Sequence, residues 1–508
     1  MNKKALVLLI FFMLGLWLPT LSVATSYTVT QITNNNTDDY VPMIHGNYVV
    51  WIEYDGNDQE IFLYDIATGI TSQITNNDIT DGAGDIYGDK IVWTGWEKSY
   101  DGSWGAEIYL YDISTGITTE ITNDVYDDWS PKIDGNKVVW YGFNGNDHEI
   151  YFYDITTGTT TQITNNNFDD SDPKISGDYI IWGGWVFENN TYTYNIYLYF
   201  VATGTTTIIA SGQVGLYDTD GKYVVWQGCN GECSGGNDVE IYVYNISSGT
   251  TAQITNNNYF DYYPLIDSGK VVWTGEDGVD EEIFMYDTAT GVTTKITDDT
   301  YEDDFSYIQN GHVVWHKHIT EDPLNQEIFV YDIATGVTTQ ISNNTYTDWD
   351  PVVFNGNIAW YGFDGNDLEI YLATPAEITP LNAKIDIDPD TINLKSKGNW
   401  ITCYIELPQG YDVNQIGVST VTLSVSGITF KAALSPTEVG DYDNDGVPDL
   451  MVKFDRQAVH SVITAGTIEM IVGGSLIDGS KFQGTDTVLV IDKGKEHTDG
   501  VDHGSVEY

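Results

Sequence analysis

The chain has 508 residues with 75 acidic and 20 basic side chains, and its net charge of −55 excludes binding to nucleic acid or anionic lipid through a basic surface. Because 41% of the residues are hydrophobic and 13% are aromatic, the chain is able to bury large cores, which excludes a disordered acidic polymer. The length predicts two or more domains, unless one of them is a large β-repeat.

Residues 1–24 have the pattern of a secretory signal peptide. Two lysines precede an apolar run from Ala5 to Leu18, and small residues follow at Ser22 and Ala24. The run is short for a membrane span, so an uncleaved anchor is the less favoured alternative. No later segment is apolar enough to cross a membrane. We therefore expect a secreted or cell-surface protein whose mature chain has no membrane span.

Residues 25–374 repeat one unit eight times, with a period of about 45 residues. Each unit contains a tryptophan after β-branched residues, a block such as Glu60–Asp65, a glycine turn, and a Thr-rich segment that typically ends in Gln-Ile-Thr. The tryptophans are Trp51, Trp93, Trp140, Trp182, Trp226, Trp273, Trp315 and Trp360. A fixed period of this size indicates a solenoid or a propeller.

The repeated unit is all-β, with short β-branched and aromatic segments bounded by Gly, Asn and Asp. Four such strands are the content of one propeller blade. The chain opens with a lone last strand, Tyr27–Thr33, and the repeats end after Ile370–Leu372 without one. The first segment is thus able to complete the last unit and remove the open edge. We predict an eight-bladed β-propeller closed in this way, with a seven-bladed ring as the alternative.

These repeats resemble the TolB-type, WD40-like propeller family. The resemblance rests on a Glu-Ile-Tyr-Leu-Tyr-Asp type of strand, a Thr-Gly turn and a Gln-Ile-Thr strand, and it extends from Tyr27 to about Thr374. It implies the propeller fold, and similar tandem copies are frequent in exported surface proteins of archaea and bacteria. It does not imply a TolB-like role in outer-membrane transport, because the blade number differs and propellers host many unrelated activities.

Three loops break the repeat. Cys229 and Cys233 flank a three-residue loop and are predicted to form a local disulfide, since a metal site would need further ligands nearby. Trp96 and Trp185 follow an anchor tryptophan by three residues in the longest loops. Function on a repeat scaffold usually lies where the symmetry is broken, so both are candidate ligand contacts. Packing within the loop is the alternative role.

The remainder of the chain has a different pattern. We predict a linker at 375–382, a smaller β-sandwich at 383–492, plausibly immunoglobulin-like, and an acidic tail at 493–508.

The segment from Asp441 to Asp449 matches the first part of a calcium-binding loop. Carboxylates at positions 1, 3, 5 and 9 and a glycine at position 6 turn several oxygens toward one hard cation. The predicted Ca²⁺ ligands are Asp441, Asp443, Asp445, Val447 and Asp449. Val452 replaces the glutamate expected at position 12, so the loop resembles the DxDxDG loops of extracellular modules, and an ordinary acidic turn is the alternative.

No known catalytic motif occurs, and residues 25–374 contain nine lysines and no arginine, which disfavours phosphate or uronate ligands. We therefore expect a non-catalytic, exported surface or secreted binding and scaffold protein whose propeller loops recognise a protein or a neutral glycan. The alternative is a secreted glycan-active enzyme that uses carboxylates of the propeller channel.

Overall fold

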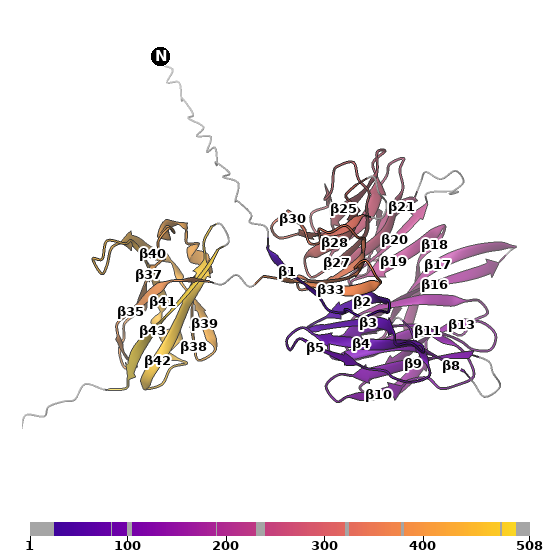
Figure 1. Cartoon of the computed structure of the whole chain (residues 1–508), viewed down its shortest axis with the longest axis horizontal. Helices are drawn as coiled ribbons and strands as arrows, with labels where there is room; N and C mark the ends of the chain where they lie inside the picture. Colours follow the sequence, from indigo (N-terminus) through magenta and orange to yellow (C-terminus); the bar gives the residue numbers. More distant parts are fainter. Residues whose placement is uncertain are drawn as a thin grey trace, which may run out of the picture. The chain divides into compact units, whose positions relative to one another are not determined.

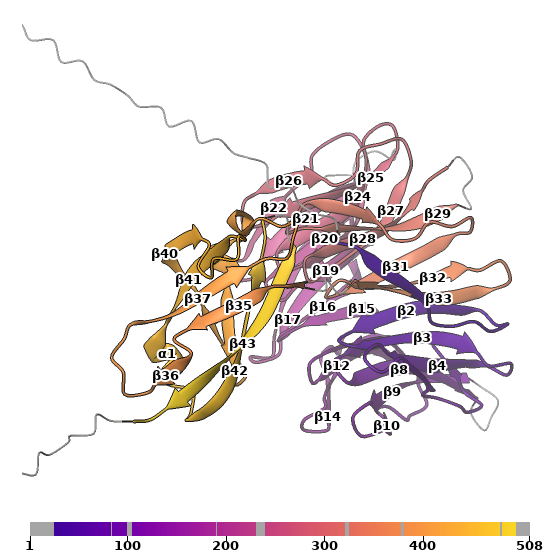
Figure 2. The ribbon, with the colours of Figure 1, turned by 60° about the vertical axis from the view of Figure 1, so that its left-hand side comes forward.

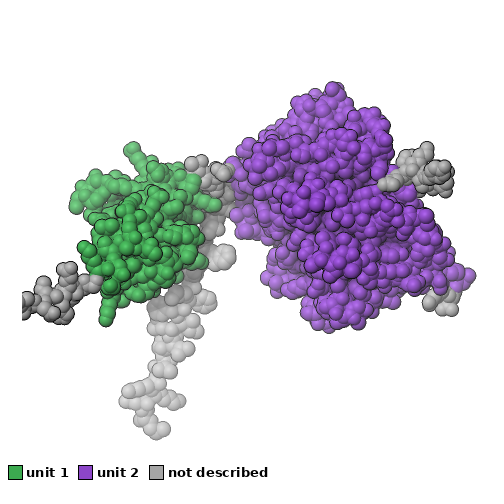
Figure 3. All heavy atoms as spheres, turned by 90° about the horizontal axis from the view of Figure 1, so that it is seen from below, with its two compact units in different colours: residues 1–23, 377–508 green, residues 24–376 purple. Residues whose placement is uncertain are grey.

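The computed structural model describes residues 25–82, 84–98, 104–188, 190–229, 239–320, 325–376, 380–477 and 480–493. These residues form two compact units, one ending at Ala376 and the other beginning after it (Figure 3). The predicted signal peptide at 1–24 and residues 494–508 of the predicted tail lie outside the described residues. Among the described residues, no helix is long and apolar enough to cross a membrane.

The first unit is a β-propeller of eight antiparallel sheets, which we number as blades 1 to 8 in chain order (Figures 1 and 2). The innermost strands are β2 (Asp39–His45), β6 (Thr80–Asp81) with β7 (Asp85–Tyr87), β11 (Asp128–Asp134), β15 (Asp170–Ser176), β19 (Val214–Thr219), β23 (Asp261–Asp267), β27 (Asp303–Gln309) and β31 (Asp348–Phe354). The second strands are β3 (Tyr48–Tyr54), β8 (Lys90–Lys98), β12 (Lys137–Phe143), β16 (Tyr179–Glu188), β20 (Tyr223–Cys229), β24 (Lys270–Glu276), β28 (His312–His318) and β32 (Asn357–Phe363).

The third and fourth strands complete each blade toward the outside. The third strands are β4 (Gln59–Asp65), β9 (Trp104–Asp112), β13 (His148–Asp154), β17 (Thr191–Phe200), β21 (Val239–Asn245), β25 (Glu281–Asp287), β29 (Gln326–Asp332) and β33 (Leu368–Pro375). The outermost strands are β5 (Ile70–Gln73), β10 (Ile117–Glu120), β14 (Thr159–Gln162), β18 (Thr205–Gly212), β22 (Thr250–Gln253), β26 (Val292–Lys295), β30 (Val337–Gln340) and, in blade 8, β1 (Tyr27–Gln31).

The N-terminal strand closes the ring. Strand β1 pairs antiparallel with β33, with Val29 opposite Ala373, and the backbone N–H of Ile32 donates to the carbonyl of Ile370 at 2.7 Å. Consecutive innermost strands contact each other around the ring, and β2 of blade 1 contacts β31 of blade 8. The all-β propeller that the repeats predict is therefore confirmed, with the first segment of the chain completing the last sheet.

The anchor tryptophans fill the spaces between sheets. All eight are at most 3% exposed, since they lie on second strands that are covered on both faces by neighbouring sheets. Most stack on an aromatic ring of the third strand, as Trp140 does on Tyr151 with ring centroids 5.7 Å apart. The β-branched residues beside each tryptophan are also buried, which explains why these short strands lack a polar face.

Buried polar groups connect six of the eight anchor tryptophans to the innermost strand of their own blade. The indole Nε1 donates to an aspartate carboxylate at the start of that strand, at 2.6–3.0 Å. The pairs are Trp93–Asp81, Trp140–Asp128, Trp182–Asp170, Trp273–Asp261, Trp315–Asp303 and Trp360–Asp348. Because these aspartates are at most 6% exposed, the bonds satisfy donors and acceptors that have no access to water.

A second set of bonds connects seven of the eight blades to the next one. A buried glutamate on the third strand accepts a hydrogen bond from a backbone N–H of the following inter-blade loop, as Glu240 does from Asn257 at 2.8 Å. The Asn257 side chain donates onward to Asp261 of blade 6 at 2.6 Å. Repeated around the ring, this arrangement fixes the inter-blade loops and explains why the same Glu, Asn and Asp recur in the sequence.

Burial also changes the protonation of these carboxyls. It raises the pKa of Asp128, Asp170 and Glu107 to about 7, although hydrogen bonds to each of them act in the opposite direction. The nearby glutamate charge adds to the effect at Asp128 and Asp170. Near neutral pH a part of these three carboxyl groups therefore holds a proton, which lowers the negative charge buried in the propeller.

The second unit is a β-sandwich built from two sheets. One sheet has the order β35 (Lys384–Asp388), β37 (Trp400–Glu406), β41 (Asp449–Asp455) and β40 (Ala433–Gly440). The other has the order β34 (Leu381–Asn382), β43 (Lys481–Ile491), β42 (Gly466–Ser475), β38 (Thr422–Val425) and β39 (Ile428–Lys431), with β36 (Thr391–Asn393) also on β43. Two 3₁₀ turns, Val413–Gln415 and Val418–Thr420, and the helix α1 (Arg456–His460) connect strands. One apolar core lies between the sheets, with Ile387, Phe454 and Val472 fully buried.

Replacement of Trp273 by Phe should destabilise the propeller more than the same change at Trp226. Both tryptophans are buried and stacked, but Trp273 donates to Asp261 at 2.7 Å, whereas Val214 stands in the aspartate's place in blade 5. The difference should be about 1–3 kcal/mol in the free energy of unfolding, because a buried acceptor loses its donor. Chemical denaturation of both variants measures it, and equal losses would contradict the assigned bond.

The propeller should be more stable at pH 5 than at pH 8.5. Raised carboxyl pKa values mean that the folded state holds protons that the unfolded chain releases above about pH 4. This stabilisation is complete below pH 4 and is lost as the pH rises through about 7, the pKa of Asp128 and Asp170. Denaturation midpoints in 0.5 M NaCl, which screens surface repulsion, measure the effect. Asp128→Asn should weaken the dependence, and a midpoint that rises with pH would contradict it.

Candidate functional site

One mouth of the propeller channel is surrounded by residues in an unusual backbone conformation. Every described innermost strand except the split one of blade 2 contains a register shift, and one residue of each bulge is exposed. We call these the bulge residues: Val41, Ser130, Asp172, Leu216, Tyr263, Phe305 and Asp350. All except Leu216 have φ between 44° and 55°.

This conformation is costly for large side chains. A left-handed backbone costs of the order of 1–3 kcal/mol for a residue other than glycine, and more for a β-branched or bulky one. The backbone is nevertheless alike at these positions, whereas the side chain changes from Val41 to Asp172 to Phe305. A backbone geometry that is shared by the bulges and carries different side chains around one opening is the arrangement expected of a ligand-binding surface.

The aromatic bulge residues form one side of a pocket of about 380 Å³. Tyr263 and Phe305 stack with centroids 5.4 Å apart and are 40% and 48% exposed. Tyr194, Leu216 and Tyr217 contribute the other apolar wall, while Asp172, Lys174 and Asp350 are also among the lining residues. A concave apolar pocket with a few charged groups has the composition of a small-molecule or side-chain binding site.

Hydrogen bonds and close packing hold the tyrosine wall in place. The Tyr217 hydroxyl donates to the carbonyl of Asp172 at 2.9 Å, which joins blade 5 to a bulge of blade 4. The Tyr194 ring lies over Gly183, where an added Cβ would be 1.7 Å from its hydroxyl oxygen. Burial raises the pKa of both tyrosines, so both hydroxyls stay protonated as donors.

Trp185 lies beside this pocket. It is 53% exposed and contacts Tyr194 at a centroid distance of 4.9 Å. Together with Tyr192, 69% exposed, it lines a neighbouring groove of about 480 Å³ that ends at Cys229. Tyr194 belongs to both cavities, so the groove continues the aromatic pocket along the extended β16–β17 hairpin.

The other predicted residues of the propeller have different surroundings. Trp96 is half-buried against Gly82 and Trp129, with the two indole centroids 5.8 Å apart. It does not line the aromatic pocket or the groove. Cys229 is disulfide-bonded, and its predicted partner Cys233 lies outside the described residues. Cys403 of the sandwich is a free, buried thiol.

The channel itself is polar and measures about 500 Å³. Carboxylates at the ends of innermost strands line it, with His45, Lys132 and Lys174 between them. Several of these carboxylates accept backbone hydrogen bonds from a neighbouring blade, as Asp218 does from Ile266 at 2.9 Å. Asp267 accepts from Asn310 at the same distance. These channel acids thus hold adjacent blades together.

The predicted calcium loop is a compact turn in the sandwich. Backbone N–H groups donate to its carboxylates, as Gly446 does to Asp441 at 3.1 Å and Tyr442 to Asp449 at 2.9 Å. The ammonium of Lys384 lies 2.6 Å from Asp443 and 3.0 Å from Asp445. Val447 is exposed. Calcium binding by this loop stays a prediction, and it requires Lys384 to leave the carboxylates.

The fold of this chain resembles that of solved β-propellers. No protein-family model and no curated protein sequence matches the chain. Among solved structures, the β-propeller domain of the Trilobed protease from Pyrococcus furiosus is 16% identical, with 61% of this chain and 99% of that one covered and a TM-score of 0.46. Dipeptidyl peptidase 4 of Porphyromonas gingivalis is 15% identical, with 76% and 66% covered and a TM-score of 0.49. An oligogalacturonate lyase in complex with manganese is 12% identical, with 68% and 99% covered and a TM-score of 0.42.

These likenesses support the β-propeller and correct the predicted function. The chain spans only 66% of the dipeptidyl peptidase, and its identity to all three structures is too low to transfer an activity. The prediction of a non-catalytic surface scaffold is nevertheless wrong on this finding. The solved propellers that resemble this chain belong to peptidases and a lyase.

The sequence did not predict most of the pocket. Tyr263 and Phe305 each occupy one position of a repeat, and they look like ordinary strand residues in a chain with 36 tyrosines. The available signal was the bulge position itself, two residues after the buried aspartate, where the residue type varies while its neighbours recur. Only Trp185, chosen because it breaks the repeat, lies next to the site.

Gly183→Ala should destabilise the protein by about 1–3 kcal/mol, because the new methyl group overlaps the Tyr194 hydroxyl and forces the ring to move. Gly215→Ala is the matched control, since its Cβ would meet nothing closer than 3.7 Å. Denaturation midpoints compare the two variants. Similar midpoints would show that Tyr194 is not held over Gly183.

Proposed function

We propose that the propeller is the peptide-binding part of an enzyme system, and that it takes a short peptide by an aromatic or apolar side chain at its N-terminal end. The observation that supports this proposal is the aromatic pocket, whose walls are Tyr194, Tyr217, Tyr263 and Phe305. Its volume of about 380 Å³ suits one large side chain with part of the adjoining backbone.

The charged rim favours an ammonium group. Asp172 and Asp350 are exposed bulge residues on two sides of the pocket, and the propeller as a whole is strongly acidic. A free α-ammonium next to an aromatic side chain would place its charge near these carboxylates while the ring stacks on Tyr263 or Phe305. Negative ligands would be repelled by the same surface.

The groove beside Trp185 provides room for the rest of a peptide. Its lining combines Tyr192 and Tyr194 with the exposed residues Gly212 and Gln213. Aromatic rings and accessible backbone groups are the features that extended peptides use in recognition. We propose that the bound chain runs from the pocket over Tyr194 into this groove.

The predictions of a TolB-type relationship and of export by the signal peptide at 1–24 are part of this proposal. The repeat pattern supports the first, and the residues around the apolar run support the second. We propose accordingly that the propeller binds the peptide outside the cell, where a disulfide such as that of Cys229 forms and persists.

Binding of Phe-Gly-Gly should be at least ten times tighter than binding of its N-acetylated form or of Gly-Gly-Gly, because only the first offers both the ring and the ammonium. Phe305→Ala should weaken binding by a similar factor, since it removes an exposed aromatic wall. Val41→Ala changes the same bulge position in blade 1, which does not line the pocket, and should leave affinity unchanged. Calorimetric titration measures each case, and equal affinity for the three peptides would refute the proposal.

A further inference from the structure

Four blades share a short loop between their second and third strands, and each loop gathers acids. The first loop position and the fourth carry polar side chains, and a glutamate follows two residues later on the third strand. The four sets are Asp55, Asp58 and Glu60; Asn144, Asp147 and Glu149; Asp277, Asp280 and Glu282; and Asp364, Asp367 and Glu369. The glutamates are fully buried in all four, so their charge must be neutralised by something nearby.

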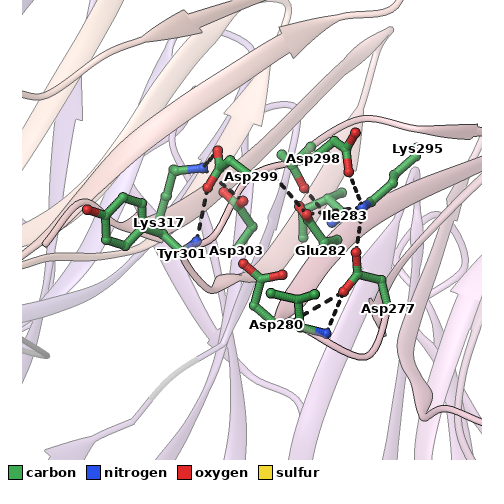
Figure 4. A network of polar contacts seen from close by, with 12 residues as sticks. Asp277, Asp280, Glu282, Ile283, Lys295, Asp298, Asp299, Tyr301, Asp303 and Lys317 are labelled. Atoms are coloured by element: carbon green, nitrogen blue, oxygen red, sulfur yellow. Dashed lines mark hydrogen bonds and ion pairs between the residues drawn. The ribbon is translucent and has the colours of Figure 1, made fainter. Parts of the chain in front are cut away.

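Blade 6 neutralises its set with a lysine (Figure 4). The ammonium of Lys295 lies 2.8 Å from Asp277, 3.2 Å from Glu282 and 2.5 Å from Asp298. Lys295 is the last residue of β26 and stands opposite Phe284 of β25. One positive charge therefore occupies the point at which the three carboxylates converge.

Blade 3 uses an amide. Asn144 replaces the first acid of the loop, and its side-chain nitrogen donates to Asp147 at 2.8 Å and to Glu149 at 3.1 Å. One carboxylate is removed and two others gain a donor. The lysine position is Gln162 in this blade, opposite Tyr151.

Blade 8 has neither the lysine of blade 6 nor the amide of blade 3. Asp364 stands where blade 3 has Asn144, and Gln31, opposite Tyr371, stands where blade 6 has Lys295. One oxygen of each of Asp364, Asp367 and Glu369 lies within 4.8 Å of the others.

The acids of this set have unused oxygens. Asp367 is 8% exposed, and neither of its buried side-chain oxygens has a hydrogen-bond partner among the described residues. Glu369 accepts from the backbone of Asn35 at 2.9 Å with Oε1, while its buried Oε2 is unpartnered.

Blade 1 repeats this arrangement. Asp55, Asp58 and Glu60 again offer oxygens within 4.8 Å of one another, and Gln73 stands at the lysine position, opposite Phe62. Glu60 is fully buried, and its Oε2 has no partner among the described residues. The same chain thus contains two sets that have a lysine or an amide and two sets that lack both. Buried oxygens without a partner among the described residues also occur at Asp280, Glu282 and Glu149 of the first two sets, so the missing lysine and amide are what distinguishes blades 8 and 1.

We propose that the acid sets of blades 8 and 1 each bind a divalent cation of the calcium class. Three converging carboxylates supply hard oxygen ligands, and a Ca²⁺ ion tolerates the irregular geometry of a loop and two strand residues. The cation takes the place that the Lys295 ammonium has in blade 6. In blade 8 it also secures the ring, because Glu369 holds Asn35 of the closing N-terminal segment.

The test is a calcium titration of the whole chain and of Gln31→Lys/Gln73→Lys, which gives blades 8 and 1 the lysine of blade 6. The double variant should bind two fewer Ca²⁺ ions per chain by equilibrium dialysis. Its melting temperature in EDTA should exceed that of the wild type, because each ammonium replaces an ion. Any ion at the Asp441–Asp449 loop is common to both proteins and cancels in the difference.

Gln162→Lys is the matched control, since blade 3 already has its amide, and it should not change the calcium stoichiometry. Asp367→Asn is a second, isosteric variant that should lose one ion even if the lysines disturb folding. Equal stoichiometry in the wild type and the double variant would overturn the proposal. So would a wild-type melting temperature that calcium does not raise above its value in EDTA.

Discussion

The propeller depends on a hydrogen bond between a buried indole and a buried carboxylate, made in six of the eight blades. The bond fastens the second strand of a blade to the start of its innermost strand. The same aspartate also accepts a hydrogen bond from the asparagine side chain of the preceding loop, as Asp261 does from Asn257. The indole bond fixes two strands within one blade, and the asparagine bond connects that blade to the preceding loop, so the two bonds together help to fix how one blade follows the next.

The acidity of the chain follows from the same design. Most blades repeat a buried carboxylate on the innermost strand and another on the third strand; the exceptions are Val214 in blade 5 and Asn195 in blade 4. This negative charge is compensated locally by protonation, by the ammonium of Lys295 in blade 6, and by the amide of Asn144 in blade 3. Carboxylates repeated from blade to blade therefore contribute to the net charge of −55, and this contribution has a structural cause.

The repeats predicted the architecture well, because the pattern of Trp, Glu and Asp is local and is copied in every blade. The missing last strand after Leu372 was enough to predict that Tyr27–Gln31 completes blade 8. The pocket was not predictable in this way. Tyr217 and Phe305 meet only through the curvature of the ring, and a left-handed backbone at Tyr263 leaves no trace in residue type. The functional prediction was wrong because it relied on loop tryptophans and on the absence of arginine. The absence of arginine disfavours some classes of ligand but does not indicate which ligand binds.

Ring closure has a consequence for the order of events during biosynthesis. Thr33 accepts from the backbone of Ile370, 337 residues later in the chain. Strand β1 is synthesised long before its partner β33. It therefore stays unpaired until the third strand of blade 8 has been made. Blades 1 to 7 each consist of consecutive strands and are able to form one after another. Strand β1 pairs only with β33, so the ring closes only after all the blades have been made.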